Sequence, residues 1–106
     1  MLKEVSNIVK GVKAWPDVTI ARDRGGLCVR LRGATLGHVR WNGRIDLPFG
    51  PDVRQRLVAE EMAYPDPDQA DGRIVFDVHN DADVERALWL FRLAYLTADS
   101  ASGACA

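Results

Sequence analysis

The stretch GHVRWNGRIDLPFG, residues 37–50, decides the fold of this chain. Apolar and polar side chains alternate on both sides of Asn42-Gly43, which is typical of strands with one buried face. Asn-Gly is the strongest short hairpin signal, because both positions tolerate a positive φ. The stretch therefore predicts an antiparallel hairpin of strands 35–41 and 45–49. Pro48 predicts that the second strand is a sheet edge or ends there.

Similar patterns extend outward from this hairpin in both directions. Alternation predicts three further strands, at residues 18–22, 27–32 and 73–79. Helical spacing of apolar residues predicts three helices, near residues 2–11, from Pro51 to Met62 and from Asp81 to Tyr95. The order αββββαβα predicts an α+β fold, a two-layer sandwich in which a mainly antiparallel five-stranded sheet carries three helices on one face.

Length and composition restrict the class of protein. The 106 residues suffice for one domain, which we place at residues 1–96, and the small polar segment 97–106 predicts a disordered tail. A net charge of −1 argues against a nucleic-acid partner. No apolar run approaches the ~20 residues of a membrane span, and the first residues are too polar for a signal peptide. We therefore expect a cytoplasmic protein without a membrane partner.

The period of two assigns side chains to the two faces of the predicted sheet. The face toward the helices receives Leu27, Val29, Leu31, Val39, Trp41, Ile45, Leu47, Ile74, Phe76 and Val78. The opposite face receives Cys28, Arg30, Arg32, His38, Arg40, Asp46, Asp77 and His79. The candidate site on this polar face consists of His38, Arg40, Asp46, Asp77, His79 and Arg30. This face is either a solvated surface with weak cross-strand ion pairs or a shallow site.

More specific chemistry finds little support in the residues. Two histidines on separate strands, without a motif, are weak evidence for a metal. Cys28 and Cys105 form no disulfide framework, and Cys28 is a strand residue rather than a thiolate nucleophile. The loop from Asp66 to Gly72 is one residue away from a calcium loop and lacks the closing glutamate. We expect no metal and no cofactor, and we assign no catalytic residue.

Several motifs in order along the chain resemble one known family. They are Trp15-Pro16, GATLGHVRWNG at residues 33–43, IDLP at 45–48, LVAEE at 57–61 and DADVERALWLFRLAY at 81–95. Together they resemble the small luciferase-like domain family, a bacterial domain of unknown function. Arg40 stands where that family has a second hairpin histidine, and the loop from Tyr64 to Gly72 also departs from its pattern. The family name implies no activity here, since flavin-dependent luciferases are barrels of about 250 residues.

Two functions are compatible with these observations. The first is a non-enzymatic binding or protein-interaction module, which binds a protein partner or forms a homodimer through the sheet face or the edge near Pro48. Arginine on that face and Trp89, as a core residue or an exposed anchor, fit this function. The second is a small-molecule-binding protein or enzyme that uses the polar face around His38. A pocket with a perturbed carboxylate or histidine would favour the second function, and a flat sheet face would favour the first.

Overall fold

The computed structural model describes residues 2–66 and 73–105. Its elements, in chain order, are α1 (Lys3–Lys13), β1 (Val18–Asp23), β2 (Gly26–Leu31), β3 (Ala34–Arg40), β4 (Arg44–Pro48), α2 (Pro51–Ala59), β5 (Tyr64–Pro65), β6 (Arg73–Asp77) and α3 (Asp81–Cys105). The predicted α+β class is confirmed. The sheet has six strands rather than five, because Tyr64–Pro65 pairs with β6 in a segment where a loop is predicted.

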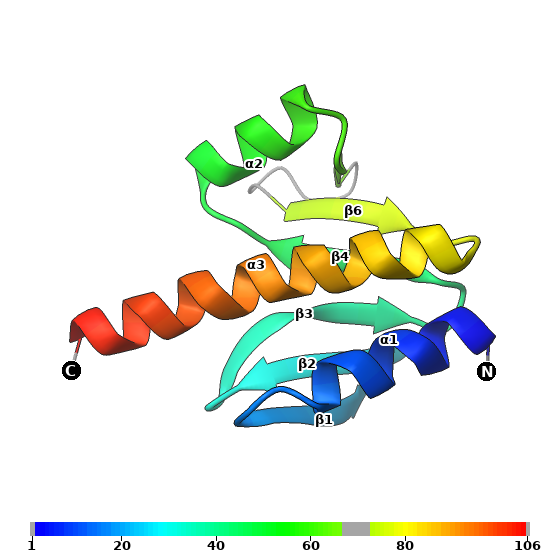
Figure 1. The fold of residues 1–106 in the computed structure, drawn as a ribbon, viewed down its shortest axis with the longest axis horizontal. Helices are drawn as coiled ribbons and strands as arrows, with labels where there is room; N and C mark the ends of the chain where they lie inside the picture. The colour runs from blue at the N-terminus through cyan, green and yellow to red at the C-terminus, as the bar shows by residue number, and fades with distance from the viewer. Residues whose placement is uncertain (1, 67–72, 106) are drawn as a thin grey trace.

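The sheet has the strand order β1-β2-β3-β4-β6-β5, and every neighbouring pair is antiparallel. The helices cover one face: α3 lies over β3 and β4, α1 lies over β1, and α2 lies beside β5 and β6 (Figure 1). None of these three helices covers the opposite face. β4 is an interior strand that ends at Pro48, so of the two alternatives predicted from Pro48 the sheet edge is wrong and the end of the strand is confirmed. A missing N–H disturbs the ladder least at that position.

The hairpin at residues 37–50 forms, but its first strand ends at Arg40, one residue earlier than predicted. Val39 pairs with Ile45 and His38 with Asp46, which leaves Trp41, Asn42 and Gly43 as a three-residue loop. Of these three, only Gly43 has a positive φ, 94°, which fits a turn followed by a left-handed residue. Trp41 therefore lies beyond the end of β3 and is 39% exposed, so its predicted place in the core is wrong.

A β-bulge between β2 and β3 changes which side chains enter the core. Val29 pairs with Gly37, while Arg30 pairs with Thr35, so Leu36 is the extra residue. Because a bulge interrupts the alternation, Leu36 is buried although its parity places it on the polar face. Gly37 then faces the helices, and a Cβ there would lie 2.9 Å from Cε1 of Phe91.

The core lies between the helices and the covered face of the sheet. It includes Val5, Ile8, Val29, Leu31, Val39, Ile45, Leu47, Leu57, Ile74, Phe76, Val78, Ala87, Leu90 and Phe91. Most of the predicted helix-facing strand residues are in this set. Arg32, which is predicted on the polar face, lies in the β2–β3 turn with φ 51° and pairs with Asp17.

Helix α3 crosses the sheet and packs against the segment between α1 and β1. The Tyr95 hydroxyl donates to the Pro16 carbonyl at 3.1 Å, and the Tyr95 ring packs edge-on against Trp15. The backbone of α3 continues to Cys105, through residues for which the sequence predicts a disordered tail. Alanines in that segment favour a helix, and the proposed division at residue 96 stays a prediction. Among the described helices, none is long and apolar enough to cross a membrane.

Candidate functional site

Three polar-face residues lie in one row across the centre of the sheet. Cys28 on β2 pairs with His38 on β3, and His38 pairs with Asp46 on β4. Directly paired residues of antiparallel strands point to the same face, and this face is the one opposite the helices. The row exists because the three-residue hairpin loop and the regular part of the β2–β3 ladder bring these positions into register.

Asp46 is the centre of an ion-pair network. Its side chain is 6% exposed, and its carboxylate accepts from His38 Nδ1 at 3.0 Å, Arg40 Nε at 3.3 Å and Arg73 Nη1 at 2.9 Å. A buried carboxylate needs such partners, because burying a charge without compensation is very costly. Arg73 is not one of the residues that the sequence predicts for the site; its position at the start of β6, opposite Pro48, brings it to Asp46.

His38 lies between two carboxylates. Its Nδ1 faces Asp46, and its Nε2 lies 3.1 Å from Oδ2 of Asp23 on β1. Ionised carboxylates only accept hydrogen bonds, so both contacts are hydrogen bonds at once only when both ring nitrogens carry protons. Asp23 is also absent from the predicted site, although its place opposite Gly26 at the β1–β2 turn allows its side chain to reach His38.

The other predicted site residues lie apart from this network. Asp77 accepts from Arg44 Nε at 2.8 Å and from Arg44 Nη2 at 3.2 Å. The hydrogen bond from Arg44 holds the pKa of Asp77 below its ordinary value; burial opposes this shift, and the charges of Arg44 and His79 add to it. His79 lies beyond the end of β6 and is exposed, with its backbone N–H donated to Asp83. Arg30 is exposed on the same face as His38.

The described side chains offer no metal centre. Within residues 2–66 and 73–98, no three His, Cys, Asp or Glu side chains are grouped so that they could hold a metal ion. The Cys28 thiol is buried, with its Sγ 3.8 Å from the Thr35 hydroxyl. The part of the calcium-like loop from residue 67 to 72 lies outside the described residues.

Three cavities lie away from the Asp46 network. One of about 290 Å³ lies between α2 and α3 and is lined by Val53, Arg56, Leu57, Glu60, Trp89 and Leu93. One of about 450 Å³ lies between α2 and β5. A third, of about 210 Å³, lies where α3 passes the ends of β3 and β4. None of the three is lined by His38, Arg40 or Asp46.

The fold and this face define a small α+β sandwich whose open sheet surface carries a buried, fully paired aspartate. A family model described as "Luciferase domain" matches residues 33–94, more than half of the chain, and includes the His38–Asp46 hairpin and Arg73. The chain therefore belongs to the luciferase domain family, as its motifs suggest. Comparison with curated proteins gave no match, and neither did comparison with solved structures.

Proposed function

We propose that this domain is a non-catalytic protein-interaction module that pairs with a second copy of itself through the groove between α2 and α3. One observation carries the proposal: Trp89 is 47% exposed in the wall of this groove. The groove is lined mainly by apolar side chains, and its rim carries Arg56 and Glu60. The groove has Val53 and Leu57 on one side and Trp89 and Leu93 on the other.

The exposed apolar surface continues along α3. Leu96 lies two turns after Trp89 and is 49% exposed. Residues at spacings of four and seven share one face of a helix, so Trp89, Leu93 and Leu96 form one stripe. Contiguous exposed apolar surface on a small domain marks an interaction site, and tryptophan is among the residues most enriched at the energetic centres of interfaces.

The charges at the rim favour a second copy as the partner. Among the described residues that line the groove, Arg56 on α2 and Glu60, the residue that follows the last turn of α2, are charged. Their own contact is 3.4 Å long between exposed side chains, so it contributes little stability. In a two-fold dimer the same patch meets itself. Two antiparallel α2 helices would then place Arg56 of each copy opposite Glu60 of the other.

The open sheet face is a weaker candidate for this interface. Arg40 and Arg73 already donate to Asp46, and Arg44 donates to Asp77. A partner that used these arginines would have to replace existing ion pairs. This favours the groove over the sheet face as the surface that binds the partner.

A charge-swap mixing experiment tests the proposal. Light scattering after size exclusion should give a concentration-dependent dimer for the wild type. Arg56→Glu alone and Glu60→Arg alone should be monomeric, because each places like charges opposite one another. An equimolar mixture of the two variants should recover the dimer, because all rim pairs then become complementary.

Arg30→Glu on the sheet face is the matched control and should leave the dimer unchanged. A wild type that is monomeric at every concentration would overturn self-association. Dissociation by Arg30→Glu, with Arg56→Glu still dimeric, would move the interface to the sheet face and overturn the groove. If Arg56→Glu, Glu60→Arg and Arg30→Glu were each still dimeric, that result would also contradict the pairing of Arg56 with Glu60.

A second candidate is a small-molecule-binding protein or enzyme at His38. The observation that favours it is the order Asp46, His38, Asp23, in which a buried carboxylate orients a histidine whose other nitrogen points toward the more exposed Asp23. A histidine held in this way is suited to proton transfer once a ligand displaces Asp23. A thermal-shift screen against nucleotides, flavins and common metabolites tests it. Stabilisation by a compound in the wild type, and its loss in folded His38→Ala, supports this function; equal stabilisation in both contradicts it.

We also propose a cytoplasmic location. The buried Cys28 thiol, which forms no disulfide in the structure, supports it, because disulfides are rare in reducing compartments.

A further inference from the structure

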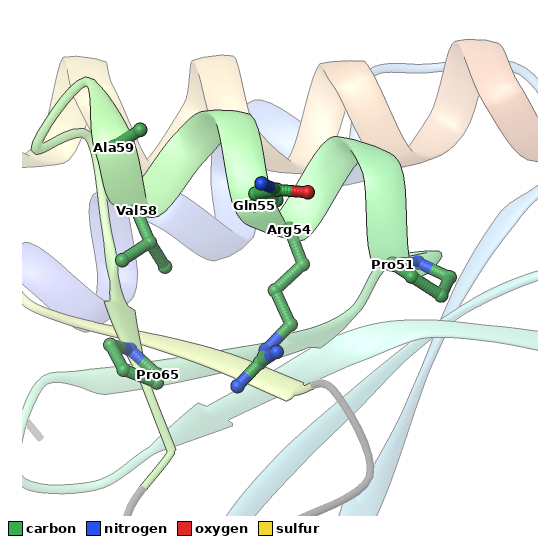
Figure 2. A pocket seen from close by; sticks show the side chains of 6 residues that line it. All are labelled: Pro51, Arg54, Gln55, Val58, Ala59 and Pro65. Atoms are coloured by element: carbon green, nitrogen blue, oxygen red, sulfur yellow. The ribbon is translucent and has the colours of Figure 1, made fainter.

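The largest of the three cavities lies on the opposite side of α2 from the α2–α3 groove. It measures about 450 Å³ and is lined by Pro51, Arg54, Gln55, Val58, Ala59 and Pro65 (Figure 2). Its size falls within the usual range for pockets that bind small molecules. Two of the lining residues are prolines, which have no backbone N–H to donate. Among the described residues that line the pocket, Arg54 and Gln55 are the ones with polar side chains, so a ligand would meet these two groups.

Among the described residues, Arg54 is the only charged one that lines this pocket. Figure 2 shows its side chain extending from α2 toward the sheet, on the same side of the helix as Val58. Its Nε is buried and has no hydrogen-bond partner, and within the described part of the chain no other buried side-chain nitrogen or oxygen lacks one. A buried donor without an acceptor is rare and costly, and a bound ligand that accepts a hydrogen bond from it would remove that cost.

Several other arginines of the domain have partners. Arg40 and Arg73 pair with Asp46, Arg44 pairs with Asp77, and Arg92 stacks over the rings of Trp15 and Tyr95. Arg54 differs from these arginines, because it lies among apolar lining residues and its buried Nε has no hydrogen-bond acceptor.

We propose that this pocket binds a small organic carboxylate, whose charged group pairs with Arg54 and whose apolar part packs against Pro51, Val58 and Pro65. A guanidinium presents two parallel N–H groups that fit the two oxygens of a carboxylate, and the interaction is strong where water is excluded. A single cation with apolar walls does not suit a phosphate, which requires more donors around it. This inference is independent of the proposed dimer, because it uses the other side of α2.

The test uses 4-phenylbutyrate and its neutral amide, which have the same shape but differ in charge. Binding is followed by isothermal titration and by the Arg54 Nε–H signal in ¹H–¹⁵N spectra. The carboxylate should bind the wild type with a dissociation constant of the order of 1 mM and shift that signal, and the amide should bind at least about ten-fold more weakly. Arg54→Gln should lose about ten-fold or more in affinity, and Arg54→Lys should retain part of it.

Arg30→Gln is the control, since it removes an exposed arginine of the open sheet face, outside both this pocket and the α2–α3 groove; it should bind like the wild type. Circular dichroism should show that Arg54→Gln is folded. Equal binding of the carboxylate by Arg54→Gln, equal binding of the amide, or no binding by the wild type would overturn the proposal. Tighter binding of inorganic phosphate than of 4-phenylbutyrate would also overturn it and would assign a phosphate site instead.

Discussion

His38 and Asp46 lie directly opposite each other on β3 and β4, with Nδ1 3.0 Å from Oδ1. Asp46 is buried at the centre of the open sheet face, and the side chains of His38, Arg40 and Arg73 surround its carboxylate. The network around this pair therefore joins four strands, since Arg73 comes from β6 and Asp23, which contacts His38, comes from β1. The network stabilises the sheet on the face opposite the helices.

Asp46→Asn should reduce the free energy of unfolding by about 2–3 kcal/mol, because hydrogen bonds to charged groups are lost and two arginines keep their charge without a counter-ion. Urea denaturation followed by circular dichroism measures the loss. Asp77→Asn is the control: the Asp77 side chain is 42% exposed and pairs with Arg44, so the loss of its charge should cost at most about 1 kcal/mol. Equal effects of the two substitutions would contradict a special role for Asp46.

The Arg44–Asp77 pair should make stability depend on pH in the acid range. The pKa of Asp77 is lowered in the folded protein, from an ordinary value of 3.8, chiefly by its hydrogen bond to Arg44. A lowered folded-state pKa adds stability above the unfolded-state pKa, and this contribution is lost as pH falls through the folded-state pKa. The difference in unfolding free energy between wild type and Asp77→Asn should therefore be constant near neutral pH and shrink below about pH 4. A difference in unfolding free energy that grows on acidification would contradict a lowered pKa of Asp77 in the folded protein.

Gly37→Ala should destabilise the fold by about 1–3 kcal/mol, because the added methyl overpacks the contact between β3 and α3. Its Cβ would lie 2.7 Å from the Asp46 carbonyl oxygen, 2.9 Å from Phe91 Cε1 and 3.0 Å from Leu47 Cγ. Gly50→Ala is a fair comparison, since nothing lies within 4 Å of a Cβ there. Thermal unfolding of both variants tests the expectation, which fails if Gly37→Ala melts at the temperature of Gly50→Ala.

Tyr95→Phe should cost about 1 kcal/mol, because the Pro16 carbonyl loses its hydroxyl donor while the ring can keep its contact with Trp15. The measurement is the midpoint of urea unfolding. Tyr64→Phe, at an exposed tyrosine on the short strand β5, serves as the control and should leave the midpoint unchanged. A larger effect at Tyr64 than at Tyr95 would contradict this assignment.

Much of the fold could be predicted from alternation and helical spacing. Val39, Ile45 and Leu47 on one face, with His38 and Asp46 on the other, follow from the period of two, and the structure places them so. The hairpin loop could not be predicted in detail. Asn42-Gly43 suits a two-residue turn, but burial of Val39 and Ile45 on one face requires an odd number of loop residues, so tertiary packing selects the three-residue loop.

The candidate site could be predicted only in part. Alternation along a strand assigns each side chain to a face of the sheet, but it does not show which strands that are distant in the sequence lie side by side. His38, Arg40 and Asp46 belong to one hairpin, within which register is local. Arg73 and Asp23 reach the same network from β6 and β1, and only the strand order brings them there. Parity alone groups Asp77 and His79 with the site, but they lie toward the other end of β6, where Asp77 pairs with Arg44.

The contacts of α3 with earlier parts of the chain have a consequence for its synthesis. Tyr95 bonds to Pro16 across 79 residues, and Phe91 covers Gly37 at the centre of the sheet. While a ribosome is still making residues 81–105, the strands already released have no helix α3 to cover β3 and β4. The growing chain must keep that apolar surface exposed until translation has passed Tyr95. Slower elongation before this point would therefore lengthen the exposure of these strands to chaperones and proteases.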